Sequence, residues 1–271
     1  MPILEANGQR LHVSERGEGT EPLLLMQGLS GNHLHWGEPF LGELAGDFRA
    51  IAYDHRGTGA SPECPGGYSV ADLADDAAAL LDVLELADVH VMGISMGGMV
   101  GQELALRHPA RVRSLVLGCT SPGGPDAART DPEVVACLRE LFLSGRVEEA
   151  MRQLFHFNVS ESFATEPANR EPFRQAAREL PVSLEAVLAQ YQAFAGHDPG
   201  ERLAAIGMPT LIVHGDGDRI LPVANARLLA RRIPHARLEI FKGVGHLFWW
   251  ERPTESARLV RELAQAAPVA Q

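Results

Sequence analysis

Short apolar runs that alternate with helix-compatible segments constrain the fold of this chain most. The runs LLLMQ and FRAIAYD each end in a glycine-rich stretch, and VHVMGI, SLVLGCT and TLIVHG follow further along. Short runs rich in Leu, Ile and Val are typical of strands that are buried on both faces. Because parallel strands need crossover connections, the alternation predicts an α/β fold with a mostly parallel central sheet flanked by helices.

Two of the predicted helices carry clear boundary signals. Ser69 and Asp72 match a capping box at the start of a helix that is expected to reach Leu86. The segment from Met96 to Arg107 is also helix-compatible, and it is followed by Pro109. A proline ring disfavours helical geometry in the residue before it, so this helix is expected to end there.

The alternation of strands and helices breaks between residues 122 and 207. This stretch contains helix-like segments rich in Phe, Leu, Arg and Glu, with prolines between them and no convincing strand. We therefore predict a core domain formed by residues 1–121 and 208–271, and a helical cap subdomain formed by residues 122–207. Most aromatic residues of the cap are expected to pack it onto the core, and the rest to line an apolar pocket.

Composition and charge argue against several classes of protein. The chain has 24 Lys and Arg against 35 Asp and Glu, and this net charge of −11 would repel nucleic acid phosphates. No run of 18 apolar residues and no leader-like start occurs, so we expect neither membrane insertion nor export. The three cysteines, Cys64, Cys119 and Cys137, include no CxxC pair, which favours reduced thiols and a cytoplasmic location. The expected partner is a small-molecule ester or lactone, and the oligomeric state is left open.

The pentapeptide GISMG at positions 93–97 has the G-x-S-x-G form. A sharp turn from strand to helix exposes the serine hydroxyl in a strained conformation, and side chains at the two glycine positions would collide with neighbouring backbone. The pentapeptide alone is weak evidence, but here a predicted strand ends at the serine and a predicted helix begins after it. The sequence therefore predicts Ser95 as a nucleophile rather than a spectator in a glycine turn.

A serine hydroxyl becomes a good nucleophile only when a neighbouring imidazole takes its proton. His246 lies in a glycine-rich loop directly after a strand predicted at Arg237 to Phe241, and we prefer it as the base over His214 and His235. The loop HGDGDRILP offers Asp216 and Asp218 as the acid that orients the imidazole. We prefer Asp218, which is followed by R-x-x-P, and expect Asp216 to cap the turn. The chain order is then Ser, Asp, His.

Taken together, these motifs resemble those of α/β-hydrolases that carry a helical cap. The resemblance runs from about Ile3 to Leu263 and rests on YDHRGTGASP, GISMGG, HGDGDRILP and GVGHLFWWERP. Within that superfamily, the first motif and GISMGGMVGQELALRHP are most similar to bacterial carboxylesterases and 3-oxoadipate enol-lactonases. The resemblance implies the α/β-hydrolase fold with a helical cap insertion.

The resemblance also implies an oxyanion hole made of two backbone N–H groups, those of Leu29 and Met96. Many relatives have His-Gly ahead of the first of these donors, whereas this chain has Gln27 and Gly28. The difference bears on the loop conformation and on substrate choice. It does not remove the backbone donor.

No cofactor or metal is expected. No G-x-G-x-x-G follows a predicted strand, so a dinucleotide site is not indicated. His33 and His35 form an H-x-H pair, but no acid and histidine follow at metallo-hydrolase spacing. Asp54 and Arg56 are interpreted as a structural ion pair or hydrogen-bonded turn rather than an anion clamp.

The predicted function is the hydrolysis of a carboxylic ester through an acyl-enzyme, so the chain is expected to be a carboxylesterase. A lactonase, a carbon–carbon bond hydrolase or a perhydrolase would use the same three residues, and these alternatives stay open. The serine at position 95 argues against dehalogenases and epoxide hydrolases, which need an aspartate nucleophile. The non-enzyme alternative is a ligand receptor built on the same fold.

Overall fold

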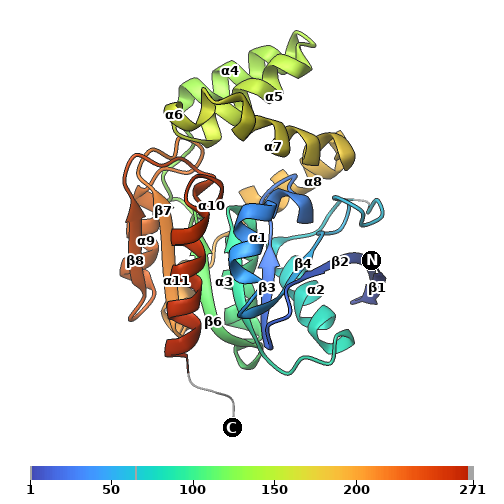
Figure 1. The fold of residues 1–271 in the computed structure, drawn as a ribbon, viewed down its shortest axis with the longest axis vertical. Coiled ribbons are helices and arrows are strands. Elements are labelled where there is room, and N and C mark those ends of the chain that lie inside the picture. Colours follow the sequence, from blue (N-terminus) through green and yellow to red (C-terminus); the bar gives the residue numbers. More distant parts are fainter. Residues whose placement is uncertain (1, 65, 268–271) are drawn as a thin grey trace.

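An eight-stranded sheet forms the centre of the molecule (Figure 1). The computed structural model describes residues 2–64 and 66–267, and the strand order is β1-β2-β4-β3-β5-β6-β7-β8. The strands are β1 (Ile3–Ala6), β2 (Gln9–Arg16), β3 (Glu21–Met26), β4 (Phe48–Tyr53), β5 (Val89–Ile94), β6 (Val112–Gly118), β7 (Thr210–Gly215) and β8 (Arg237–Phe241). β1 and β2 pair antiparallel with their neighbours, and all pairs from β4 to β8 are parallel. The predicted α/β architecture with a mostly parallel sheet is confirmed.

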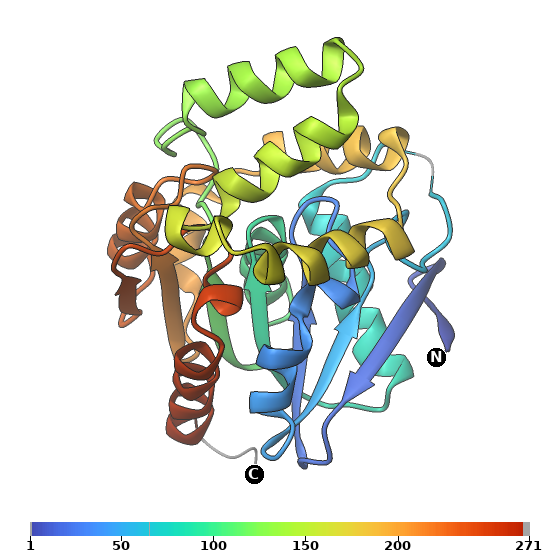
Figure 2. The same cartoon turned by 45° about the horizontal axis from the view of Figure 1, so that its top comes forward.

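Helices cover both faces of the sheet (Figures 1 and 2). The α-helices are α1 (Glu38–Leu44), α2 (Val70–Val83), α3 (Met96–Arg107), α4 (Pro132–Leu143), α5 (Val147–Asn158), α6 (Glu161–Ala164), α7 (Pro167–Glu179), α8 (Leu184–Ala195), α9 (Ala224–Arg232), α10 (Phe248–Glu251) and α11 (Pro253–Ala266). Short 3₁₀ helices are η1 (His33–Trp36), η2 (Pro109–Arg111) and η3 (Gly200–Ala205). No α-helix in the described part of the chain is long and apolar enough to cross a membrane.

Two apolar cores result from the alternation of side chains along the strands. In β3, Leu24 and Met26 belong to the core beneath α2, α3 and α9, whereas Leu23 and Leu25 belong to the core beneath α1 and α11. All four side chains are fully buried, and burial of each leucine contributes about 2 kcal/mol. A strand buried on both faces needs apolar residues at every position, which explains the continuous run LLLM.

The first two strands were not expected from the sequence. Asn7 and Gly8 join them with φ values of 51° and 69°, as two-residue hairpin turns of antiparallel strands require. β2 has the sequence QRLHVSER and lies near the sheet edge, between β1 and β4. Strands near an edge tolerate polar residues, so this segment lacks the apolar run by which strands further along the chain were predicted. The Asn-Gly pair was the available signal for this hairpin.

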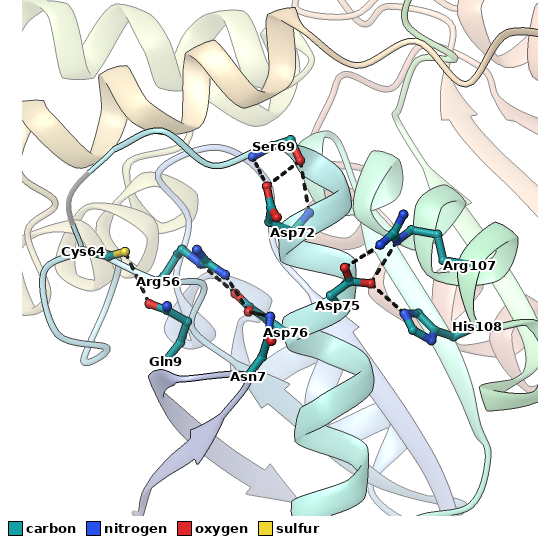
Figure 3. Close-up of polar contacts among 10 residues, drawn as sticks. All are labelled: Asn7, Gln9, Arg56, Cys64, Ser69, Asp72, Asp75, Asp76, Arg107 and His108. Carbon is teal, nitrogen blue, oxygen red and sulfur yellow. Dashed lines mark hydrogen bonds and ion pairs between the residues drawn. The ribbon is translucent and has the colours of Figure 1, made fainter.

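The predicted capping box on α2 is present (Figure 3). The side chain of Ser69 accepts a hydrogen bond from the backbone N–H of Asp72, and the Asp72 carboxylate accepts one from the backbone N–H of Ser69. The helix ends at Val83, three residues earlier than expected, and Glu85 then adopts a positive φ of 56°. The apolar Leu84 and Leu86 pack beyond the helix end, so the apolar spacing overestimated its length.

The alternation of strands and helices is interrupted between β6 and β7 by α4 to α8, which we call the helical insertion. Residues 122–207 contain no strand, and Figures 1 and 2 show these helices stacked over the end of the sheet opposite the last turn of α11. That end is the carboxyl edge of the parallel strands, where ligands bind in open α/β sheets. The division into a core domain and a cap subdomain stays a prediction.

Candidate active site

Ser95 occupies the sharp turn between β5 and α3. Its φ of 53° and ψ of −123° lie outside the regions that L-residues normally adopt. A Cβ atom added to Gly93 would come within 2.1 Å of Gly97 O, and one added to Gly97 within 2.1 Å of Met26 O. The glycines at these two positions are therefore sterically required, as the G-x-S-x-G motif predicts.

His246 and Asp218 come together at the same edge of the sheet. His246 lies in the loop between β8 and α10, and its Nδ1 is 2.6 Å from Oδ2 of Asp218, which follows β7. Both residues are buried. Because a carboxylate only accepts hydrogen bonds, Nδ1 carries the proton and Nε2 is left as the basic nitrogen.

Ser95 and His246 line the same pocket. Within the described part of the chain, no hydrogen bond joins the Ser95 hydroxyl to the imidazole. Such contacts are often long before substrate binds and tighten in the reacting complex. The structure therefore brings the three predicted catalytic side chains to one place. The contact between Asp218 and His246 is formed, whereas the contact between His246 and Ser95 is not.

Asp218 is the more constrained of the two candidate acids. Its Oδ1 accepts hydrogen bonds from the backbone N–H groups of Ile220 and Leu221, at 2.8 and 2.9 Å. Asp216 is exposed and accepts a hydrogen bond from the backbone N–H of Gly243, so it joins two loops. Only Asp218 contacts the imidazole of His246.

His214 is a second imidazole on the same carboxylate. It is fully buried, and its Nε2 lies 3.0 Å from Oδ2 of Asp218 and 2.7 Å from the carbonyl oxygen of Leu221. Its Nδ1 has no hydrogen-bond partner. The Nε2–H therefore stabilises the Asp218 carboxylate. His214 was expected only as a competing base, because no spacing pattern shows that a strand end faces the following loop.

The pKa of Asp218 reflects these contacts. Burial raises the pKa, but the charge on His246 and the hydrogen bonds from His214 and His246 outweigh it and lower the pKa to about 2. The acid is thus held as a carboxylate at any pH near neutrality. An ionised Asp218 can orient the His246 ring and stabilise its protonated form.

The loop after β3 passes close to Ser95. A Cβ atom added to Gly28 would lie 2.9 Å from Cβ of Ser95. The backbone carbonyl of Gln27 accepts a hydrogen bond from Nε2 of His55, and the Gln27 side-chain oxygen accepts a longer one from the N–H of Gly28. Leu29 lines the pocket near Gly28, and Met96 starts α3 directly after Ser95. Their roles as oxyanion donors stay predictions.

His33 and His35, the two histidines of the H-x-H pair, belong to different sites. His33 Nδ1 lies 2.8 Å from Oδ2 of Asp54, and His12 Nδ1 lies 3.1 Å from the same oxygen. These three residues offer ligand atoms within 4.8 Å of one another and so could hold a metal ion. However, the backbone N–H groups of His33 and Ala60 also bind the carboxylate, so hydrogen bonds already engage Asp54 fully. His35 instead lines the pocket.

Asp54 and Arg56 are structural, but they do not pair with each other. Arg56 forms a two-pronged ion pair with Asp76 on α2, with distances of 2.6 and 2.7 Å (Figure 3). Burial raises the pKa of Asp54, but the hydrogen bonds of His12 and His33 outweigh it and hold the pKa below its ordinary value. The hydrogen bonds of Asp54 therefore hold the loop that contains Leu29 in position, and the ion pair of Arg56 holds α2 against the loop after β4.

The pocket at Ser95 has a volume of about 530 Å³ and lies between the sheet edge and the helical insertion. The insertion contributes side chains that are mostly apolar. They include Met151, Leu154, Phe173, Ala177, Tyr191 and Phe194. A substrate that reaches Ser95 therefore contacts both parts of the molecule.

Several known proteins resemble this chain in sequence and in fold. The protein named carbamate hydrolase RutD from Azorhizobium caulinodans is 33% identical, with 92% of each chain covered. A thermophilic esterase from Thermogutta terrifontis is 27% identical, with a TM-score of 0.80 and 98% of each chain covered. Est816, described as an N-acyl homoserine lactone degrading enzyme, is 30% identical with a TM-score of 0.80, and the match covers 96% of this chain and 99% of that one.

The fold also matches that of the enol-lactonase from Burkholderia xenovorans, with a TM-score of 0.84, 24% identity, and coverage of 97% of this chain and 100% of that one. The family model for the alpha/beta hydrolase fold matches residues 21–253. The sequence, the sheet topology and the turn at Ser95 all agree with that match. The chain therefore belongs to the α/β-hydrolase family.

Proposed function

We propose that this hydrolase cleaves a carboxylic ester through an acyl-enzyme, with Ser95 as nucleophile, His246 as general base and Asp218 as orienting acid. The observation that carries the proposal is the 2.6 Å contact between His246 and Asp218 in the pocket that Ser95 also lines. The strained backbone of Ser95 supports it further, because such strain is typical of nucleophiles at strand-to-helix turns.

In the first half-reaction, Oγ of Ser95 attacks the carbonyl carbon of the ester while Nε2 of His246 takes the hydroxyl proton. The negative charge that develops on the carbonyl oxygen is stabilised by the backbone N–H groups of Leu29 and Met96. Each such donor contributes about 3 kcal/mol to the transition state in other hydrolases. The tetrahedral intermediate then expels the alcohol, which receives the proton from His246, and the acyl group stays on Ser95.

In the second half-reaction, His246 takes a proton from water, and the resulting hydroxide attacks the acyl-enzyme. The intermediate collapses, Oγ of Ser95 regains a proton from His246, and the carboxylic acid leaves. Asp218 stays ionised throughout. Its carboxylate stabilises the imidazolium that forms in both steps.

A lactone is the second candidate substrate, supported by the 30% identity to Est816, which degrades N-acyl homoserine lactones. The bonds made and broken are the same, but the alcohol that leaves stays attached to the acyl group. The name of the RutD relative adds carbamates to the possible carbonyl substrates. Carbon–carbon bond cleavage and perhydrolysis would use the same three residues.

A rapid-mixing experiment with a short-chain p-nitrophenyl ester tests the proposal. The expected result is a burst of p-nitrophenol equal to the enzyme concentration, absent in Ser95→Ala. A panel of acyl esters, lactones and vinylogous diketones, each assayed beside Ser95→Ala, then identifies the substrate class. Tight ligand binding without any burst or turnover would instead indicate a receptor.

A further inference from the structure

Among the described residues, the lining of the pocket at Ser95 contains no acidic side chain and no lysine or arginine. Apart from His246, the one titratable side chain with a pKa near neutrality in water is His35. Burial lowers the pKa of His35 to about 4, so this ring is uncharged under ordinary conditions. The pocket therefore offers a bound substrate no cation other than the catalytic imidazolium.

Two of the polar side chains of the lining, Asn158 and His35, are engaged within the protein, whereas Nε2 of Gln27 has no hydrogen-bond partner among the described residues. Nδ2 of Asn158 donates to the carbonyl oxygen of Leu154 at 2.6 Å. Nδ1 of His35 accepts a hydrogen bond from the backbone N–H of Asn32 at 3.2 Å. The remaining lining is mostly apolar, with the uncharged polar side chains of Ser30, Thr130 and Tyr191 among it, and it continues to the exposed Met151 and Tyr191 at the rim.

Cations are present nearby, but they line a different cavity. This second cavity has a volume of about 430 Å³ and lies between α5 and α7. Its arginines are Arg152, Arg170, Arg174 and Arg178. Met151, Phe173 and Ala177 line both cavities and so form part of the wall between them. Arg174 donates two hydrogen bonds to Glu171, at 2.8 and 3.0 Å, and lines the second cavity but not the pocket at Ser95.

We infer that this enzyme selects uncharged substrates with an apolar acyl chain and rejects those that carry a carboxylate on the acyl part. The inference rests on the proposed function and narrows it. A carboxylate that leaves water for an apolar pocket without a partner loses its hydration and gains nothing in return. Esters and lactones of monocarboxylic acids fit this pocket, whereas half-esters of dicarboxylic acids do not.

The test compares p-nitrophenyl hexanoate with the mono-p-nitrophenyl ester of adipic acid, which differ only by a methyl group or a carboxylate at the chain end. We expect kcat/KM to be lower by about 100-fold for the adipate ester, because an unpaired carboxylate must be desolvated. The net charge of −11 also repels anions at long range, but added salt screens that effect. The preference should therefore persist at high ionic strength.

A variant at the rim provides the converse test. Met151 is 38% exposed, so an arginine there is compatible with the fold. Met151→Arg should raise kcat/KM for the adipate ester by about tenfold, as expected for a partly exposed ion pair. Met151→Gln is the uncharged control. Leu188→Arg adds the same charge at an exposed position outside the pocket lining and should change nothing.

The failure of the inference can be told apart from the failure of the proposed function. Labelling of Ser95 by a neutral fluorophosphonate, read by mass spectrometry, reports on the nucleophile alone. If Ser95 is labelled and both esters are hydrolysed equally well, the inference is wrong and the proposed function stands. If activity on the adipate ester is high and is lost in Arg174→Gln, the second cavity binds the carboxylate, and the inference is again wrong. If Ser95 is not labelled and no ester reacts, the proposed function itself fails.

Discussion

The loops at the sheet edge and the helical insertion line the same pocket but are built differently. At the sheet edge, the Asp218 carboxylate contacts two imidazoles and two backbone N–H groups, and the turn at Ser95 tolerates no side chain at Gly93 or Gly97. On the insertion, large apolar side chains are left exposed. They include Val135, Leu143, Met151, Leu184, Leu188 and Tyr191.

The difference separates two tasks. Groups that transfer protons must be held closely, and hydrogen bonds to buried groups provide that precision. Groups that only contact the acyl chain need an apolar surface of suitable shape, which helices packed through side chains provide. We therefore expect substitutions at the sheet edge to change the rate of reaction for all substrates, and substitutions on the insertion to change which substrates react.

The largest expected effect is at the acid. Asp218→Asn should lower kcat by about 10⁴-fold for every ester, because the imidazole loses both its orientation and the charge that stabilises its protonated form. The matched control is Asp216→Asn in the same loop, which should keep most of the activity. Steady-state kinetics with acetate and hexanoate esters measure both variants. A loss confined to one chain length would contradict the separation of tasks.

The acid also contributes to stability in a defined pH range. The pKa of Asp218 is lowered from 3.8 to about 2 in the folded protein. The ionised carboxylate therefore contributes about 2 kcal/mol to the free energy of unfolding above pH 4, and this contribution is lost as the pH falls through the pKa of the folded protein, about 2. Urea unfolding of wild type and Asp218→Asn at a series of pH values measures this. The difference between them in free energy of unfolding should shrink between about pH 4 and pH 2, and a constant difference would show that the charge of Asp218 is not responsible.

His214 should act as a positioning residue with a smaller effect. His214→Phe removes the second donor to Asp218 and should lower kcat by about tenfold, with KM little changed. The pH–rate profile should also shift, because the carboxylate that faces His246 is altered. His214→Gln, which keeps a side-chain donor, should recover part of the activity. An unaltered pH profile in His214→Phe would show that the residue only fills space.

The smallest effect is expected on the insertion. Leu154 lies on α5 and lines the pocket. Leu154→Ala should raise KM for a hexanoate ester by about a few-fold, because the acyl chain loses apolar contact with this side chain. The same variant should leave kcat for an acetate ester unchanged. A comparable loss on both esters would mean that the insertion also shapes the reacting geometry.

Much of this site could be predicted from the sequence because the requirements are local. The turn at Ser95 needs small residues at two fixed positions, and the capping box of α2 needs Ser69 and Asp72 three residues apart. Apolar runs at β3 and β5 mark strands that are buried on both faces. These patterns can be recognised along the chain without the fold, although the atom that a side chain at Gly97 would meet, the carbonyl oxygen of Met26, is distant in sequence.

Contacts between distant segments were decided only by the tertiary structure. Arg56 pairs with Asp76 rather than Asp54, and His214 faces Asp218 although it was considered only as a competing base. Which side chains of the insertion reach the pocket also depends on how α5, α7 and α8 pack over the sheet edge. The sequence by itself determined the buried strands β3 to β7 and the turn at Ser95, because short apolar runs and small residues at fixed positions are visible along the chain. Packing determined the partners of the acid and the lining of the pocket, because no spacing along the chain records which surfaces meet.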